Sequence, residues 1–388
     1  MSVREQRQHS SVLIALLCAA IALFLHVPLV HSQLSTNSDP NRTKEAEHSD
    51  ESELQIGTRL TRAGRFQEAI PHLVVAQGRV SNPYAADFNL ALCYVATRQS
   101  ARAIPILARL RGTHENVQVE NLLAQAYVGS GNSKEALAAV RRGAALRPGD
   151  ERLYLFVADA CTENKNYELG LDVVDLGIEN LPKSAALHYQ RAMLLSSLDE
   201  FDASRPDFRL AKELGAGGDI GYLAAAQESL LDGKVDDAIA AAREGNKVGG
   251  SNYRLLTILG EALLRSGITP GQPPFAEAEA ALSKAVSIRP NYSDAQLALG
   301  RLNLISHRLR EAISHLEEAR ALDPQNPAIY SNLAAAYREQ GDRGKAQQVL
   351  SVLAQINREQ AEKISSAPGE RKPVAGASRA NRRGTPKD

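Results

Sequence analysis

The sequence predicts an all-α protein: a right-handed superhelical solenoid of about nine helix-turn-helix repeats, closed by a carboxyl-terminal capping helix. The first observation behind this prediction is a small residue that recurs at a near-constant interval inside a helical pattern. The second is another small residue that follows it at a fixed offset. The third is a set of helix-ending prolines and mid-unit glycines in the same register.

The first small residue, the anchor of each unit, recurs at intervals of 34, 33, 34, 34, 34, 34, 40 and 34 residues. The anchors are Gly57, Ala91, Ala124, Ala158, Ala192, Ala226, Gly260, Gly300 and Ala334. A second small residue lies 12 positions later in eight units: Ala69, Ala103, Ala136, Gly170, Ser204, Ala238, Ala312 and Ala346. In the seventh unit it is Ala278, delayed by six residues, which matches the interval of 40 and places an insertion at the Pro- and Gly-rich residues 269–274.

Helix-breaking residues divide each unit. Prolines end units at Pro148, Pro182, Pro290 and Pro324, where a helix has to stop. Glycines fall midway, in the predicted turn between two helices, at Gly64, Gly131, Gly233, Gly267 and Gly341. Each unit is therefore a pair of helices, and the small residues are needed where the two helices cross closely.

This pattern resembles the tetratricopeptide repeat family over residues 51–363. The unit from Gln296 to Pro324 is the most similar, and its matching residues are Leu299, Gly300, Ala312, Leu316, Ala319 and Pro324. No unit has the tryptophan that the family prefers; Tyr154, Tyr222, Leu256 and Tyr330 stand in its place. Pro206 inside a second helix is a further departure.

Composition agrees with packed helices and excludes some partners. Hydrophobic residues make up 44% of the 388 residues, aromatic residues only 5%, and there is no tryptophan. The 45 basic and 45 acidic residues balance, so no global field favours nucleic acid or an acidic membrane. Cys93 and Cys161 lie two units apart, so we expect two buried thiols and no disulfide between them.

The amino-terminal residues 1–32 predict a signal peptide. Arg4 and Arg7 precede an apolar run from Val12 to Leu25, and Val30 and Ser32 suit cleavage after Ser32. An uncleaved anchor through residues 12–30 is the alternative, with membrane association as its consequence. Both readings place the bulk of the chain outside the cytoplasm, in the periplasm or secreted, because the basic residues precede the apolar run.

Two polar segments flank the predicted solenoid at residues 51–363. Residues 33–50 lack hydrophobic periodicity and predict a flexible linker. Residues 364–388 predict a disordered basic tail, which we interpret as solubilising rather than as a nucleic-acid binder because it has no aromatic residue for base stacking.

No catalytic, metal or cofactor site is predicted. The histidines outside the signal segment make no paired spacing with another His or Cys that suits zinc. Gly215, Gly217, Gly218 and Gly221 superficially resemble a phosphate-binding loop, but they follow a predicted helix and not a strand, so we expect an inter-repeat turn. The sequence therefore predicts a protein that is not an enzyme.

The family resemblance implies that ligands bind on the concave face, lined by the first helix of each unit. Residues three before each anchor form one row on that face: Leu54, Phe88, Asn121, Leu155, Tyr189, Leu223, Thr257, Leu297 and Ser331. The residues that follow the anchors form a mixed polar row. From both rows we predict these partner-binding residues: Phe88, Leu92, Asn121, Gln125, Asp159, Tyr189, Met193, Leu223, Gln227, Glu261 and Arg301. The first row is unusually apolar, which favours either a groove for a peptide or packing against neighbouring helices; both remain open.

The leading functional hypothesis is a non-enzymatic scaffold or adaptor of an envelope assembly that holds a protein or peptide in the concave groove. The alternative is a carrier or chaperone that holds exported or unfolded chains along the apolar row. The envelope assignment rests on analogy with the family and not on particular residues.

Overall fold

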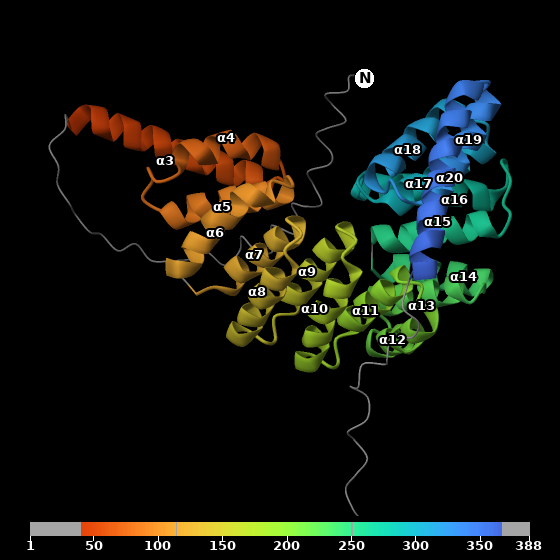
Figure 1. The fold of residues 1–388 in the computed structure, drawn as a ribbon, viewed down its shortest axis with the longest axis horizontal. Coiled ribbons are helices and arrows are strands. Elements are labelled where there is room, and N and C mark those ends of the chain that lie inside the picture. Colours follow the sequence, from red (N-terminus) through yellow and green to blue (C-terminus); the bar gives the residue numbers. More distant parts are fainter. Residues whose placement is uncertain (1–39, 114, 250, 367–388) are drawn as a thin grey trace, which may run out of the picture.

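The structure is a computed structural model that describes residues 40–113, 115–249 and 251–366. Over these residues it contains 18 helices and no strand. Consecutive helices pack as pairs, and the first helix of each pair also packs on the first helix of the next. Figure 1 shows the pairs following one another around an arc, with the first and last pairs at its two ends. The predicted solenoid is confirmed.

The first helices of the nine pairs are α3 (Pro40–Arg62), α5 (Pro83–Ala96), α7 (Val117–Gly129), α9 (Glu151–Glu163), α11 (Ala185–Ser197), α13 (Asp219–Leu231), α15 (Tyr253–Arg265), α17 (Ser293–Ile305) and α19 (Pro327–Gln340). The second helices are α4 (Phe66–Ala76), α6 (Ser100–Thr113), α8 (Ser133–Leu146), α10 (Tyr167–Asn180), α12 (Phe201–Leu214), α14 (Val235–Val248), α16 (Pro273–Ile288), α18 (Leu309–Leu322) and α20 (Arg343–Ser366). Every anchor lies on a first helix and every second small residue on a second helix.

The small residues are buried where the two helices of a pair cross. At Gly260 an added Cβ would lie 2.3 Å from Cγ of Leu282, and at Gly300 it would lie 2.7 Å from Cγ of Leu316. Leu282 and Leu316 are themselves fully buried, so neither has free space to move into. The close crossing that the sequence pattern predicts is thus the reason for the small side chains.

The turn inside each pair contains a residue in the left-handed backbone region seven positions after the anchor, and the seventh pair has a second one, Gly271, in its insertion. In five pairs it is glycine, as predicted: Gly64, Gly131, Gly233, Gly267 and Gly341. In the other four it is a residue with a side chain: Arg98, Lys165, Asp199 and His307, with φ between 56° and 61°. The repeat therefore imposes this backbone conformation even where the sequence carries no glycine to indicate it.

Successive pairs are joined by a recurring hydrogen bond. A side chain four residues before the anchor bonds the carbonyl oxygen of the proline that ends the preceding unit. The pairs are Tyr154 Oη to Pro148 (3.0 Å), His188 Nε2 to Pro182 (3.2 Å), Gln296 Nε2 to Pro290 (2.7 Å) and Tyr330 Oη to Pro324 (2.7 Å). These bonds satisfy carbonyl groups near the helix ends that have no partner within the helix.

Several boundaries differ from, or fall outside, the predictions. Helix α3 begins at Pro40, so residues 40–50 are helical and only residues 33–39 of the predicted flexible linker lie outside the described residues. Proline at the first helical position and the Glu and Lys residues after it favour a helix. The linker prediction was wrong for residues 40–50 because it relied on their lack of hydrophobic periodicity. The connection between α15 and α16 is longer, as the predicted insertion requires, but Pro273 and Pro274 of the predicted loop are the first residues of α16, where proline is tolerated.

Gly215, Gly217 and Gly218 lie between α12 and α13, as the predicted inter-repeat turn requires, whereas Gly221 lies inside α13. Helix α20 continues to Ser366. The predicted signal peptide and most of the basic tail lie outside the described residues. Within the described residues, no helix combines the length and the apolar character needed to cross a membrane.

Candidate functional site

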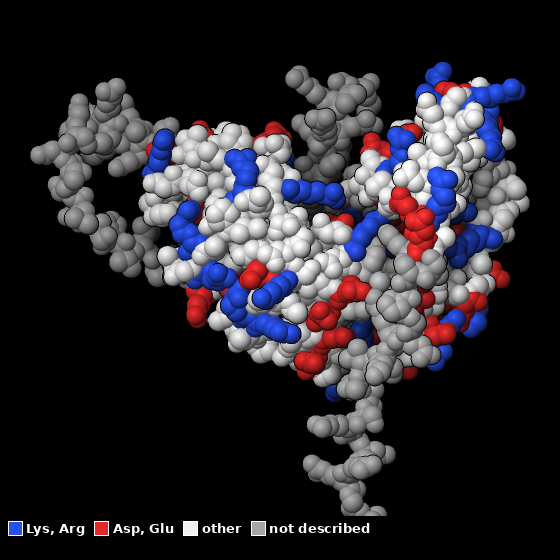
Figure 2. Space-filling model, in the orientation of Figure 1, with Lys and Arg blue, Asp and Glu red and all other residues white. Residues whose placement is uncertain are grey.

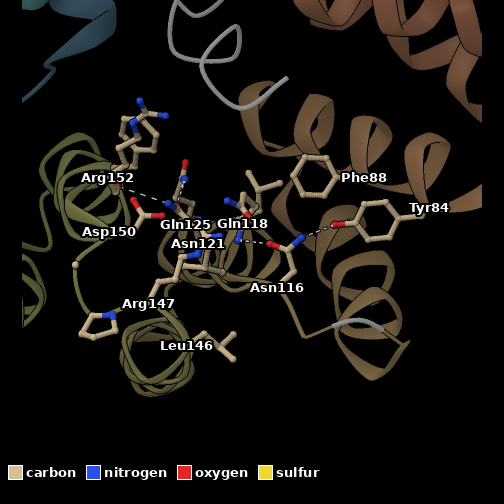
Figure 3. A pocket seen from close by; sticks show the side chains of 15 residues that line it. Tyr84, Phe88, Asn116, Gln118, Asn121, Gln125, Leu146, Arg147, Asp150 and Arg152 are labelled. Atoms are coloured by element: carbon tan, nitrogen blue, oxygen red, sulfur yellow. Dashed lines mark hydrogen bonds between the residues drawn. The ribbon is translucent and has the colours of Figure 1, made fainter. Parts of the chain in front are cut away.

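A pocket of about 820 Å³ opens between the second, third and fourth helix pairs. It is lined by residues of α5, α7 and α9 and by the turn that joins α8 to α9. Figure 3 shows Tyr84 and Phe88 along one side and Arg147, Asp150 and Arg152 along the other, with amide side chains between them. The aromatic side, the charged side and the amide floor between them differ in chemistry, and each is built from a different segment of the chain.

The aromatic side comes from the first turns of α5. The rings of Tyr84 and Phe88 are stacked, with centroids 5.8 Å apart and an angle of 14° between their planes. Asn116 holds this side in place. Its Nδ2 donates to Tyr84 Oη at 3.1 Å, while its Oδ1 accepts from the backbone N–H of Gln118 at 2.8 Å and caps α7. Burial raises the pKa of the Tyr84 phenol, so the ring stays neutral.

The floor between the walls is amide-rich. Gln125 Nε2 donates to Asn121 Oδ1 at 2.6 Å, one helical turn away on α7. Asn121 Nδ2 lies 3.5 Å from the carbonyl oxygen of Arg152, at the limit of a hydrogen bond. Amide side chains offer donors and acceptors together, the same pair of groups that an extended peptide backbone presents.

The opposite side carries net positive charge. It is formed by the turn after α8 and the first turns of α9, including Arg147, Asp150, Arg152 and the half-buried Phe156. Two guanidinium groups stand there against one carboxylate. The hydrogen bond from Tyr154 to Pro148 fixes this turn, so the inter-repeat bond that organises the fold also shapes the pocket.

The structure brings three of the predicted partner-binding residues together in this pocket: Phe88, Asn121 and Gln125. Leu92 lies one turn further along α5 and is buried away from the pocket. The remaining predicted residues are spread along the later repeats. Met193, Gln227 and Arg301 are half-buried there, and Glu261 forms an ion pair with Arg265 of its own helix.

The apolar first row is mostly packed inside the solenoid. Six of its nine members are buried: Leu54, Phe88, Asn121, Tyr189, Leu223 and Thr257. Tyr189 meets Phe208 edge-on with ring centroids 6.0 Å apart. Packing between helices therefore accounts for the buried members outside the pocket, while Phe88 and Asn121 turn their small exposed surface toward the pocket.

Sequence reasoning missed the pocket residues that lie outside the two rows, among them Tyr84, Asn116, Arg147, Arg152 and Phe156. One signal was available: Asn116 stands directly before a helical pattern, as an N-cap residue does. Apart from Pro148, which ends a unit, the turn residues carry no repeat signature, because their position depends on how one helix pair packs on the next.

Neither a metal-binding cluster nor an exposed thiol occurs among the described residues. No group of three or more His, Cys, Asp or Glu within the described ranges is arranged to hold a metal ion. Cys93 and Cys161 are free and buried. Burial raises the pKa of each thiol to about 12, so neither is a thiolate near neutral pH.

Comparison with protein families decides the identity of the repeats. Two family models, both described as tetratricopeptide repeat, match residues 54–115, 121–185 and 275–327 in one case and 303–366 in the other. Together they cover more than half of the chain. The chain belongs to the tetratricopeptide repeat family. The tetratricopeptide pairs α11 to α14, which lie between the matched ranges, follow the same pairing and the same left-handed turn.

Several solved structures are similar to this tetratricopeptide repeat protein. A chain of the APC/C hetero-tetramer Cut9-Hcn1 is 14% identical with a TM-score of 0.50, covering 82% of this chain and 67% of that chain. A tetratricopeptide repeat protein from Parabacteroides merdae ATCC 43184 is 19% identical with a TM-score of 0.45, covering 66% and 99%. YrrB, described as a TPR protein with an unusual peptide-binding site, is 21% identical with a TM-score of 0.33, covering 50% and 96%. No curated protein sequence matches the chain.

Proposed function

We propose that this protein is a non-enzymatic scaffold or adaptor that binds a protein or peptide partner in the pocket between its second and fourth repeats. Tetratricopeptide repeats are protein-interaction modules, and solenoids present extended concave binding surfaces. The observation that carries the proposal is the combination found in the pocket: an aromatic side, an amide floor and a positive side. That combination fits an extended peptide with an apolar anchor and an acidic group.

The surface charge supports a local site over a general electrostatic attraction. Figure 2 shows Lys and Arg interspersed with Asp and Glu, with no single sign covering the visible face. The sequence as a whole carries no net charge. Partner choice would then come from particular side chains, as in the pocket.

The proposed setting is an envelope assembly outside the cytoplasm. Its support is the order of charge and hydrophobicity in residues 1–32, with basic residues before an apolar run and small residues at the expected cleavage position. Amino-terminal sequencing of the mature protein tests it. A chain that starts at Gln33 supports export with cleavage, and a full-length chain recovered in the cytoplasmic fraction overturns the proposed setting.

The burial of the first row favours a scaffold over a carrier. A carrier for unfolded chains needs a continuous exposed apolar surface, whereas most of the apolar row is packed between helices. The two functions also differ in stoichiometry, because a scaffold holds one partner in a fixed ratio and a carrier holds many in small amounts.

The test is purification from the native source of wild-type protein and two variants. Gln125→Leu together with Arg147→Glu changes the pocket, and Ala240→Glu changes an exposed position on α14 as the matched control. We expect one stoichiometric partner that is lost from the pocket variant and kept by the control. A partner set that is identical for all three proteins, or many substoichiometric partners, would contradict the proposal.

A further inference from the structure

The curvature of the solenoid brings the end of α9 against segments far along the chain. The arc in Figure 1 sets the middle repeats opposite the carboxyl-terminal arm that begins with α15. Three ion pairs join the two sides across the concave face, and their members are 95, 126 and 158 residues apart in sequence. Neighbouring repeats are about 34 residues apart, so these contacts are not part of the packing of one repeat on the next.

The three pairs are complementary in order. On the α9 side, Asp159 and Glu163 are followed by Lys165 in the left-handed turn after the helix. Asp159 Oδ1 lies 3.2 Å from Arg254 Nη2, and Glu163 Oε1 lies 2.9 Å from Arg289 Nη2.

Lys165 Nζ bonds a carboxylate oxygen of Asp323, just after α18. The first side therefore reads acid, acid, base, and the facing side reads base, base, acid. Such a sequence of charges fits one relative position of the two sides and opposes a shifted one.

Tyr253 at the start of α15 organises the two arginines. Its Oη accepts from Arg289 Nη1 at 2.8 Å and from Arg254 Nε at 3.0 Å. Its ring also lies 5.1 Å from the Arg289 guanidinium carbon and meets the ring of Tyr292 edge-on at 5.0 Å. The arginines are thereby held in position to meet the carboxylates of α9.

All six charged side chains keep partial contact with solvent, between 21% and 48% of their side-chain surface. Charges with this exposure are screened by salt, and an isolated pair of this kind contributes little. Here three ion pairs oppose the same movement, so their contributions add. Separation of the middle repeats from the carboxyl-terminal arm would break all three pairs at once.

We propose that Asp159, Glu163 and Lys165, with Arg254, Arg289 and Asp323, form a salt-sensitive latch that holds the solenoid closed across its concave side. Release of the latch lowers the curvature and exposes the concave surface of the middle repeats. Helix α9 also carries Arg152 and Phe156 of the pocket, so one helix belongs to both the latch and the candidate binding site. The latch does not depend on the proposed function, since it concerns only the shape of the chain.

The test measures the distance across the latch in the full chain. Spin labels at Asn164→Cys and Gln325→Cys, both exposed positions beside Lys165 and Asp323, report it by pulsed electron spin resonance with the native cysteines replaced by alanine. We expect one short distance at low salt. Raising the ionic strength to about 1 M, where the Debye length falls to about 3 Å, should reduce the short-distance population at least about threefold.

Charge reversal separates the latch from general effects on folding. Glu163→Arg should shift the labels to longer distances at low salt, and Glu163→Arg with Arg289→Glu should restore the short distance. Glu277→Arg, which breaks the exposed pair with Arg243 between α14 and α16, is the matched control and should leave the distance unchanged. An unchanged distance in Glu163→Arg and at high salt, an equal shift in the control, or no rescue by the double variant would overturn the latch.

Discussion

Gly260 is the position where the close crossing of two helices is most directly testable. A Cβ at this position would lie 2.3, 2.5 and 2.9 Å from Cγ, Cδ2 and Cδ1 of Leu282, which is fully buried. Alanine in a helix interior is favoured over glycine by about 1 kcal/mol. Overpacking of a dense core costs roughly 1–3 kcal/mol. Because all three contacts would be shorter than 3.0 Å, the upper part of this range, roughly 2–3 kcal/mol, applies at Gly260. After the propensity gain is subtracted, we expect Gly260→Ala to lower the free energy of unfolding by roughly 1–2 kcal/mol.

The matched control is Gly112→Ala in α6, where an added Cβ meets nothing within 4 Å. It should raise stability by up to about 1 kcal/mol, since only the propensity term remains. Urea denaturation followed by circular dichroism compares the two variants, and hydrogen exchange of α15 and α16 peptides localises the effect, because long repeat arrays can unfold in steps. A Gly260→Ala protein as stable as the wild type would refute the reasoning, as would equal effects at both glycines.

Three further predictions follow from single residues. Arg98→Gly should raise the free energy of unfolding by about 0.5–1 kcal/mol, because Arg98 holds φ at 59°; an unchanged urea midpoint would count against it. Burial raises the pKa of Cys93 to about 12, so iodoacetamide at about pH 8 should label it only after denaturation, and rapid labelling of the native chain, read by mass spectrometry, would contradict the burial. Burial lowers the pKa of His315 below its ordinary value of 6.5, and its Nδ1 lies 2.8 Å from Gln296 Oε1. The unfolded chain therefore binds this proton more readily, and stability should fall as the pH drops below about 6.5; the urea midpoint of His315→Gln should change less with pH, and equal slopes would refute this.

The repeat could be predicted from the sequence because its signal is local. Each anchor and each second small residue reports the crossing of two helices only a dozen residues apart. The seven-residue offset from anchor to turn was visible only where glycine occupies the turn. At Arg98, Lys165, Asp199 and His307 the packing of the pair imposes the left-handed backbone, and the residue type gives no sign of it.

The pocket and the latch were harder to predict because they depend on the relative orientation of successive pairs. Small rotations between repeats add up along the array, and only their sum decides that Lys165 meets Asp323. The same limit explains why Phe88 and Asn121 line the pocket, whereas Tyr189 and Leu223, at the equivalent register positions, are buried without lining it. The position of a residue within its repeat identifies the helix face on which it lies, but not the part of the chain that lies opposite that face.

The central claim is that the protein binds a partner through the pocket, and site-specific photo-crosslinking tests it most directly. A photoreactive phenylalanine derivative would replace Gln118, which lines the pocket, and in a second protein Ala240, which is exposed on α14. After irradiation in the native cells, the account predicts one crosslinked protein from position 118, lost when Gln125→Leu is added, and no such product from position 240. The same products from both positions, or none from position 118, would contradict it.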